Sequence, residues 1–226
     1  MTRRMIFPLL LGLVGAAVLI ALGVWQLQRL EWKENVIAEI EARIGADPVP
    51  LPESPDPERD RFLPVTATGT ITDEELDVLV SVRQAGPAYR IISAFETDAG
   101  RRILLDRGYV PDEAKDDPRA PARGVTVTGN LHWPDEVDRW TPPPEIDRNI
   151  WFARDVPRMA EVLGTEPVMI ILRTSSEPDP TVTPLPIETA GIPNDHLEYA
   201  VTWFGLALVW VGMTAFLLWR IRQRTV

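Results

Sequence analysis

The sequence contains no cysteine, and only two of its 226 residues are histidine. Without cysteine the protein cannot form a disulfide, a thiolate site for zinc or an iron–sulfur cluster, or a cysteine nucleophile. A copper chaperone is also disfavoured, because Cu(I) prefers thiolate and thioether ligands and the five methionines are scattered along the chain. The histidines that remain as candidate ligands are His132 and His196.

The chain also has no strongly basic region apart from its two ends. The net charge is -10, and residues 34 to 194 hold 30 of the 33 acidic residues but only 16 of the 23 basic ones. Phosphate backbones are bound by basic surfaces. The acidic middle of the chain therefore argues against nucleic acid as a partner.

Catalytic motifs are missing as well. The sequence has no Gly-x-Ser-x-Gly, no phosphate-binding glycine loop and no His-Glu-x-x-His. The carboxylates of Asp135, Glu136 and Asp138 lie close together in sequence, and such runs are usually solvated surface. We therefore expect a protein that is not an enzyme.

Two long stretches lack charge. Residues 5 to 25 are apolar, and Tyr199 to Trp219 contains no charged side chain. Each is long enough for a helix to cross a bilayer core of about 30 Å. A cleaved signal peptide is the alternative for the first stretch, but its apolar region is normally only about 7–15 residues. Gly12 and Ala16 would let this helix approach another closely, or they are ordinary residues of a membrane helix.

The charges beside these stretches predict the orientation. Arg3 and Arg4 precede the first, and Arg220, Arg222 and Arg224 follow the second. By the positive-inside rule both termini are cytoplasmic, and the central region is periplasmic in a bacterial inner membrane. The predicted boundaries are 1–28 for the cytoplasmic start and first span, 29–194 for the periplasmic domain with its helical stalk and linkers, 195–219 for the second span, and 220–226 for a basic tail.

The central region predicts a mostly antiparallel β domain with one or two helices, an α+β fold. The first helix should continue to Ile44 and stop at Gly45, and the proline-rich stretch from Asp47 to Pro57 reads as an extended linker. Asp155 should cap a short helix that ends at Gly164. Strands are expected at 61–71, 76–83, 89–96, 102–110, 124–131 and 167–173, with turns at 72–73, 86–87 and 98–100.

The start of the second span carries the candidate site. On a helix one face holds His196 and the residues that follow it at helical spacing, namely Tyr199, Ala200, Trp203, Ala207 and Trp210. Flat aromatic rings beside small residues could hold a planar apolar ligand, and imidazole is a normal axial ligand of haem iron. The alternative is an aromatic belt at the membrane surface with a polar helix start. His132, in a loop beside Trp133, is expected to be a surface histidine.

Four segments together resemble the Surfeit locus protein family, the assembly factors of haem–copper cytochrome c oxidase, and the bacterial type in particular. They are GVWQLQRLEWK at 23–33, RGYVP at 107–111, NIWFARDVPRMAEVLG at 149–164 and NDHLEYAVTWFGLALVW at 194–210. They occur in the order and topology of the family and extend over the whole chain. Gly69 also resembles a family glycine of structural importance.

The resemblance implies an assembly factor that binds haem a and assists its insertion into oxidase subunit I. His196 matches the family histidine implicated in haem binding, which makes it the predicted iron ligand. Tyr199, Trp203, Trp25 and Arg29 are the other residues of the predicted cofactor site, at the outer edge of the two spans. Subunit I, haem a synthase and the lipid bilayer are the expected partners. The alternative is a membrane-anchored scaffold that stabilises nascent subunit I without binding cofactor.

Overall fold

The computed structural model describes residues 3–83, 85–178 and 180–223. Of the predicted cytoplasmic ends, residues 1–2 and 224–226 therefore lie outside the described residues. The chain forms two compact units. One consists of Met1–Glu39 with Thr189–Val226, and the other is Ile40–Glu188.

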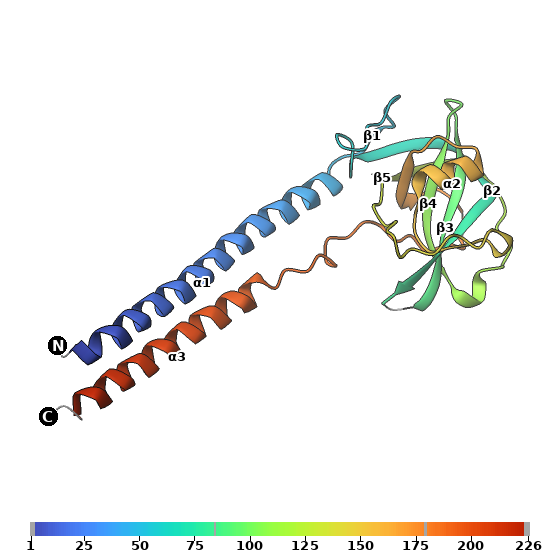
Figure 1. The fold of residues 1–226 in the computed structure, drawn as a ribbon. Helices are drawn as coiled ribbons and strands as arrows, with labels where there is room; N and C mark the ends of the chain where they lie inside the picture. The colour runs from blue at the N-terminus through green and yellow to red at the C-terminus, as the bar shows by residue number, and fades with distance from the viewer. Residues whose placement is uncertain (1–2, 84, 179, 224–226) are drawn as a thin grey trace. The chain divides into compact units, whose positions relative to one another are not determined.

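The first unit is a pair of long helices, α1 (Arg3–Ile44) and α3 (His196–Gln223). Both are long and apolar enough to cross a membrane, as predicted. They run antiparallel and side by side (Figure 1). Gly12, near the start of α1, lies against Thr214 near the end of α3, and Gln26, further along α1, lies against His196 at the start of α3. Pro8 is accommodated inside α1 near its start. As expected, α1 ends immediately before Gly45, whose amide donates to the carbonyl of Glu41.

The second unit is built on a sheet that closes on itself. Strand β2 pairs with β3, β3 with β4, β4 with β7, β7 with β5, and β5 again with β2. Closure gives each of these five strands a neighbour on both sides over part of its length, which reduces the edge open to other chains. Its strands are β2 (Pro64–Val82), β3 (Gly86–Thr97), β4 (Arg102–Pro111), β5 (Ala122–Leu131) and β7 (Met169–Ser175).

The sheet is mixed, with antiparallel pairs in the majority. The β4–β7 pair is parallel, and so are the pairs that β2 makes with the short strands β1 (Val49–Pro50) and β6 (Ile150–Trp151). Two short 3-10 helices, η1 (Asp112–Ala114) and η2 (Ile146–Arg148), lie in the loops that follow β4 and β5. The expected α+β fold with few helices is confirmed.

The predicted turn at Thr72 and Asp73 is wrong. Residues 61–71 and 76–83 were expected as two strands, but one strand, β2, runs through both, with an irregular register between Ile71 and Glu75. The first half of β2 pairs with β5 and the second half continues along β3, so the strand must bend where it changes neighbours. Thr72 and Asp73, which were interpreted as a turn, lie at a bend within the strand.

Gly69 lies where β2 has both neighbours, paired with Thr97 of β3 and with Val125 of β5. A Cβ atom here would come within 2.1 Å of the Glu96 carbonyl oxygen. Glycine is required because the two backbones approach closely. This gives a structural reason for the resemblance of Gly69 to the family glycine.

The proline-rich stretch also differs from the extended linker that its composition predicts. Val49 and Pro50 pair with β2, and the Pro52 carbonyl accepts a hydrogen bond of 2.6 Å from Arg101 Nη1. Leu51 packs against the buried cluster inside the ring. The stretch is thus attached to the barrel, through backbone pairing with β2 and through the packing of Leu51.

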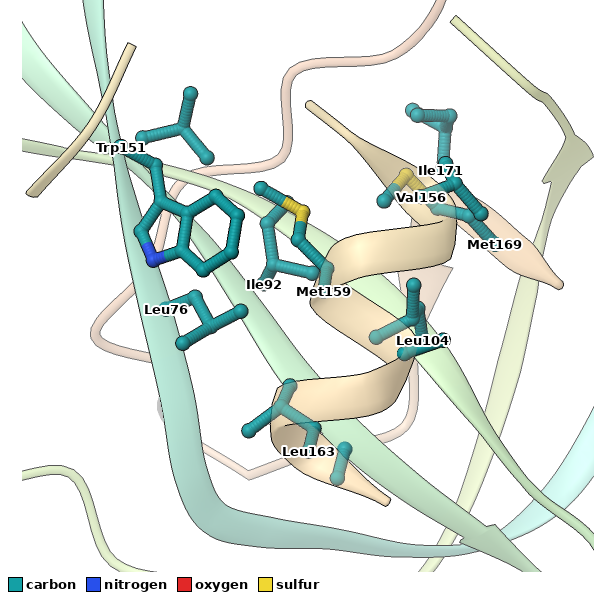
Figure 2. Close-up of a cluster of buried hydrophobic side chains, with 12 residues drawn as sticks. Leu76, Ile92, Leu104, Trp151, Val156, Met159, Leu163, Met169 and Ile171 are labelled. Atoms are coloured by element: carbon teal, nitrogen blue, oxygen red, sulfur yellow. The ribbon is translucent and has the colours of Figure 1, made fainter. Parts of the chain in front are cut away.

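Helix α2 (Val156–Leu163) has the predicted bounds and covers one face of the sheet (Figures 1 and 2). The Asp155 carboxylate accepts from the Arg158 amide at the start, and Gly164 adopts a left-handed conformation at the end. The apolar side of α2 packs on strand residues and on Trp151 (Figure 2). This cluster comprises Leu76, Val78, Ile92, Ala94, Leu104, Trp151, Val156, Met159, Ala160, Leu163, Met169 and Ile171.

Candidate functional site

His196 is the first residue of α3 and makes a side-chain contact with α1. Its Nδ1 atom lies 2.7 Å from Oε1 of Gln26. The side chain of Gln26 is polar and yet only 8% exposed. A polar side chain inside a membrane helix is costly unless it finds a partner, so the two side chains satisfy each other.

This hydrogen bond determines which imidazole nitrogen is free. With the amide oxygen of Gln26 as acceptor, Nδ1 donates its proton to this contact, and Nε2 is the ring nitrogen left to meet another group. Nε2 has no hydrogen-bond partner among the described residues. Metal-binding histidines are commonly held in this way, with one ring nitrogen donating to a neighbouring acceptor and the other facing the metal.

Small residues on α1 let the two helices come close enough for that contact. A Cβ atom on Gly23 would lie 2.7 Å from the Phe204 ring, and one on Gly15 would lie 2.4 Å from Trp210 Nε1. The same Trp210 nitrogen donates 3.0 Å to the Gly12 carbonyl. Ala16 is buried too. Close approach over small residues is a usual mode of helix packing in membranes.

The predicted site residues divide between two sides of the helix pair. His196 and Trp203 are partly buried on the side of α3 that contains the buried Ala200 and Ala207. Tyr199 and Trp25 are exposed, at 56% and 51%, on the outer surfaces of their helices. Arg29 is also exposed, and its guanidinium lies over the Trp32 ring at 4.3 Å from the ring centroid.

The available donors suit a haem better than a bare metal ion. No group of three or more His, Asp or Glu side chains that could hold a metal exists in the described part of the chain. A porphyrin supplies four equatorial nitrogens, so one histidine suffices as the protein ligand. The exposed rings of Tyr199 and Trp25 offer flat apolar surface near this end of the helices. Asn194 Oδ1, two residues before His196, is buried without a partner in the described structure and could accept from a ligand.

His132 is not the surface histidine that was expected. Its ring stacks on Phe62, with the centroids 5.1 Å apart, and its Nδ1 is buried without a partner among the described residues. Burial, with the nearby positive charges of Arg154 and Arg61, lowers the pKa of His132 to about 4. The ring is therefore neutral at ordinary pH, and it is half-buried against Phe62 instead of lying free on the surface.

The barrel also holds a network of buried charges. Asp106 is fully buried and pairs with Arg90 and with Arg154, at 3.1 Å for Arg154. Arg154 also binds Glu136, and despite the opposing effect of burial this contact lowers the pKa of the Glu136 carboxyl. Glu136 thus takes part in this network while remaining exposed, and Asp135 and Asp138 are exposed too, as expected of a solvated acidic run.

Gln26 is the residue of the site that was not predicted. Its signal in the sequence is its spacing, because Gln26 continues the small-residue face of Gly12, Ala16 and Gly23 at helical intervals. A glutamine that continues a stripe of small residues faces the partner helix. Only the pairing with His196 shows what the glutamine contacts.

The fold and the site define a class: a two-span membrane protein whose chain forms a mixed, closed β domain after the first span and before the second, with a histidine at the helix–helix contact. A family model described as the SURF1 family matches residues 13–208. The chain belongs to the SURF1 family, which confirms the predicted family.

Several named relatives span most of the chain. Surfeit locus protein 1 of Homo sapiens is 32% identical over 212 residues, which cover 82% of this chain and 69% of the human protein. The Xenopus tropicalis protein of the same name is 32% identical over 213 residues, with coverage of 82% and 67%. A SURF1-like protein of Rickettsia bellii is 29% identical over 230 residues and covers 95% of this chain and 90% of its own. The bacterial relative therefore matches nearly from end to end.

Proposed function

We propose that the protein is a membrane-anchored, non-enzymatic assembly factor for haem–copper cytochrome c oxidase, which binds haem a through His196 and assists its insertion into subunit I. The observation that carries the proposal is the His196–Gln26 contact, which engages Nδ1 and leaves Nε2 of the imidazole available to bind iron. Bound haem a would contribute the iron and a flat porphyrin face. Trp203, on the same side of α3 as His196, would offer ring surface to that face, Tyr199 and Trp25 would border the ligand from the exposed surfaces of the helices, and Arg29 would offer a positive charge to an acidic substituent.

The proposed arrangement in the cell follows from the charges around the two spans. Both termini are cytoplasmic, and the barrel is in the periplasm. His196 then lies at the periplasmic end of α3, because that helix begins at His196 and ends near the basic tail. Subunit I is the proposed recipient of haem a, and haem a synthase is the proposed donor.

The first experiment is an absorbance spectrum of the full chain, purified in detergent from cells that make haem a. We expect a Soret band in the wild type that is lost in His196→Ala at equal protein yield. The matched control is His132→Ala, which removes the other histidine of the chain and should keep the band. A full Soret band in His196→Ala would overturn the ligand assignment.

A second candidate function is a scaffold that holds nascent subunit I and binds no cofactor. The observation in its favour is the same hydrogen bond, because a His–Gln pair between two membrane helices also stabilises their packing. This function predicts that the protein copurifies with oxidase subunits but is free of haem. Haem a bound to the isolated protein, with no oxidase subunit present, would exclude it.

A further inference from the structure

We propose that Gln26 is the positioning residue of the haem site: its side-chain oxygen fixes the tautomer and orientation of His196 and, being neutral, limits the strength of the iron–histidine bond. This inference rests on the proposed function, since it assumes that His196 binds the iron. It goes further by assigning to a residue of the other helix the control over how tightly haem is held.

The geometry around Gln26 leaves its side chain little choice of partner. The side chain is 8% exposed, and Ala200, one turn after His196, is 1% exposed. One turn before Gln26, Gly23 has no side chain and lies against Phe204. The amide oxygen is thus held 2.7 Å from Nδ1 in a part-buried contact, and the hydrogen bond persists because its loss would leave the buried amide of Gln26 unpaired.

The chemical character of the partner sets the properties of the ligand. A carboxylate that accepts from Nδ1–H gives the imidazole more anionic character, which strengthens its bond to ferric iron and lowers the reduction potential. A neutral amide accepts the same proton and orients the ring equally well, but it transfers less charge. The structure thus provides a well-oriented ligand of moderate strength, which suits a protein that must later release its haem.

Two substitutions at Gln26 separate orientation from ligand strength. Gln26→Glu keeps the shape and an acceptor oxygen, and we expect a lower reduction potential and slower release of ferric haem a to excess apomyoglobin. Gln26→Leu removes the acceptor, and we expect release to be faster by roughly 10–100-fold, the usual effect of losing such a partner. Gln28→Leu is the matched control, because Gln28 is exposed on the same helix and should leave both quantities unchanged.

The measurements distinguish this inference from a purely structural role and from the proposed function itself. If Gln26 only stabilised helix packing, Gln26→Leu would lower the Tm of the protein while Gln26→Glu left the reduction potential unchanged. That result, or an equal rate of haem release from Gln26→Glu, Gln26→Leu and Gln28→Leu, would overturn the inference. A Soret band retained in His196→Ala would instead overturn the proposed function. If the band is lost in His196→Ala but the Gln26 variants keep the wild-type reduction potential and rate of haem release, only the positioning role is overturned.

Discussion

Replacing Asp106 with asparagine tests whether the barrel depends on its buried charge network. The side chain of Asp106 is fully buried, and those of Arg90 and Arg154 are 11% and 14% exposed. Oδ1 of Asp106 also accepts from the Gly108 amide at 3.1 Å. Asparagine has nearly the same shape, so the substitution removes a negative charge without creating a cavity.

The expected cost follows from what remains after the substitution. Arg90 and Arg154 would face each other with Glu136 as the one remaining carboxylate in their network. Breaking a buried ion pair from one side costs about 3–5 kcal/mol, because a buried charge is left uncompensated. For a domain of this size each kcal/mol corresponds to roughly 2–4 °C in Tm. We therefore expect the Tm of the barrel to fall by roughly 6–20 °C.

The assay is thermal unfolding of the full chain in detergent, followed by near-ultraviolet circular dichroism. Asp116→Asn is the matched control, because Asp116 also pairs with a cation at 3.1 Å, but its side chain is 92% exposed. Exposed pairs contribute little to stability, so this variant should unfold near the wild-type Tm. The reasoning is refuted if the two variants unfold at the same temperature. A second substitution, Arg90→Met, should recover part of the loss in the Asp106 variant.

Two further predictions concern the barrel. Gly69→Ala should lower the free energy of unfolding, measured by urea titration, by about 1–3 kcal/mol or more, because the new Cβ would meet the Glu96 carbonyl oxygen at 2.1 Å. The control is Gly191→Ala, where nothing lies within 4 Å of the new Cβ, and it should have no such effect. For His132, the folded-state pKa of about 4 lies below the ordinary value of 6.5, so the unfolded chain binds more protons between these values and stability should fall as the pH drops from 6.5 to 4. His132→Phe should flatten that part of the stability curve, and an unchanged slope would contradict the assignment.

Local sequence signals predicted most of the elements, because those signals reflect local chemistry. Asp155 and Gly164 delimit α2 through cap geometry, and Gly45 follows the last residue of α1. The bend at Thr72 was misread, because the change of partner from β5 to β3 is a property of the closed ring. The half-buried position of His132 was missed for the same reason, since Phe62, on which its ring stacks, is 70 residues earlier in the chain.

The candidate site shows the same limit at the level of single side chains. Helical spacing alone placed His196 and Trp203 on one face of α3, and it would have placed Gln26 beside Gly23 on α1. The distance of 2.7 Å between Gln26 and His196 depends on how the two antiparallel helices are aligned along their length. That alignment is determined by several contacts at once, including Gly12 with Thr214 and Gly23 with Phe204. A shift of one helical turn, about 5.4 Å, would preserve every apolar face and separate the histidine from its acceptor. The fit between small residues and large rings therefore does more than hold the helices together, because it determines which nitrogen of His196 is free.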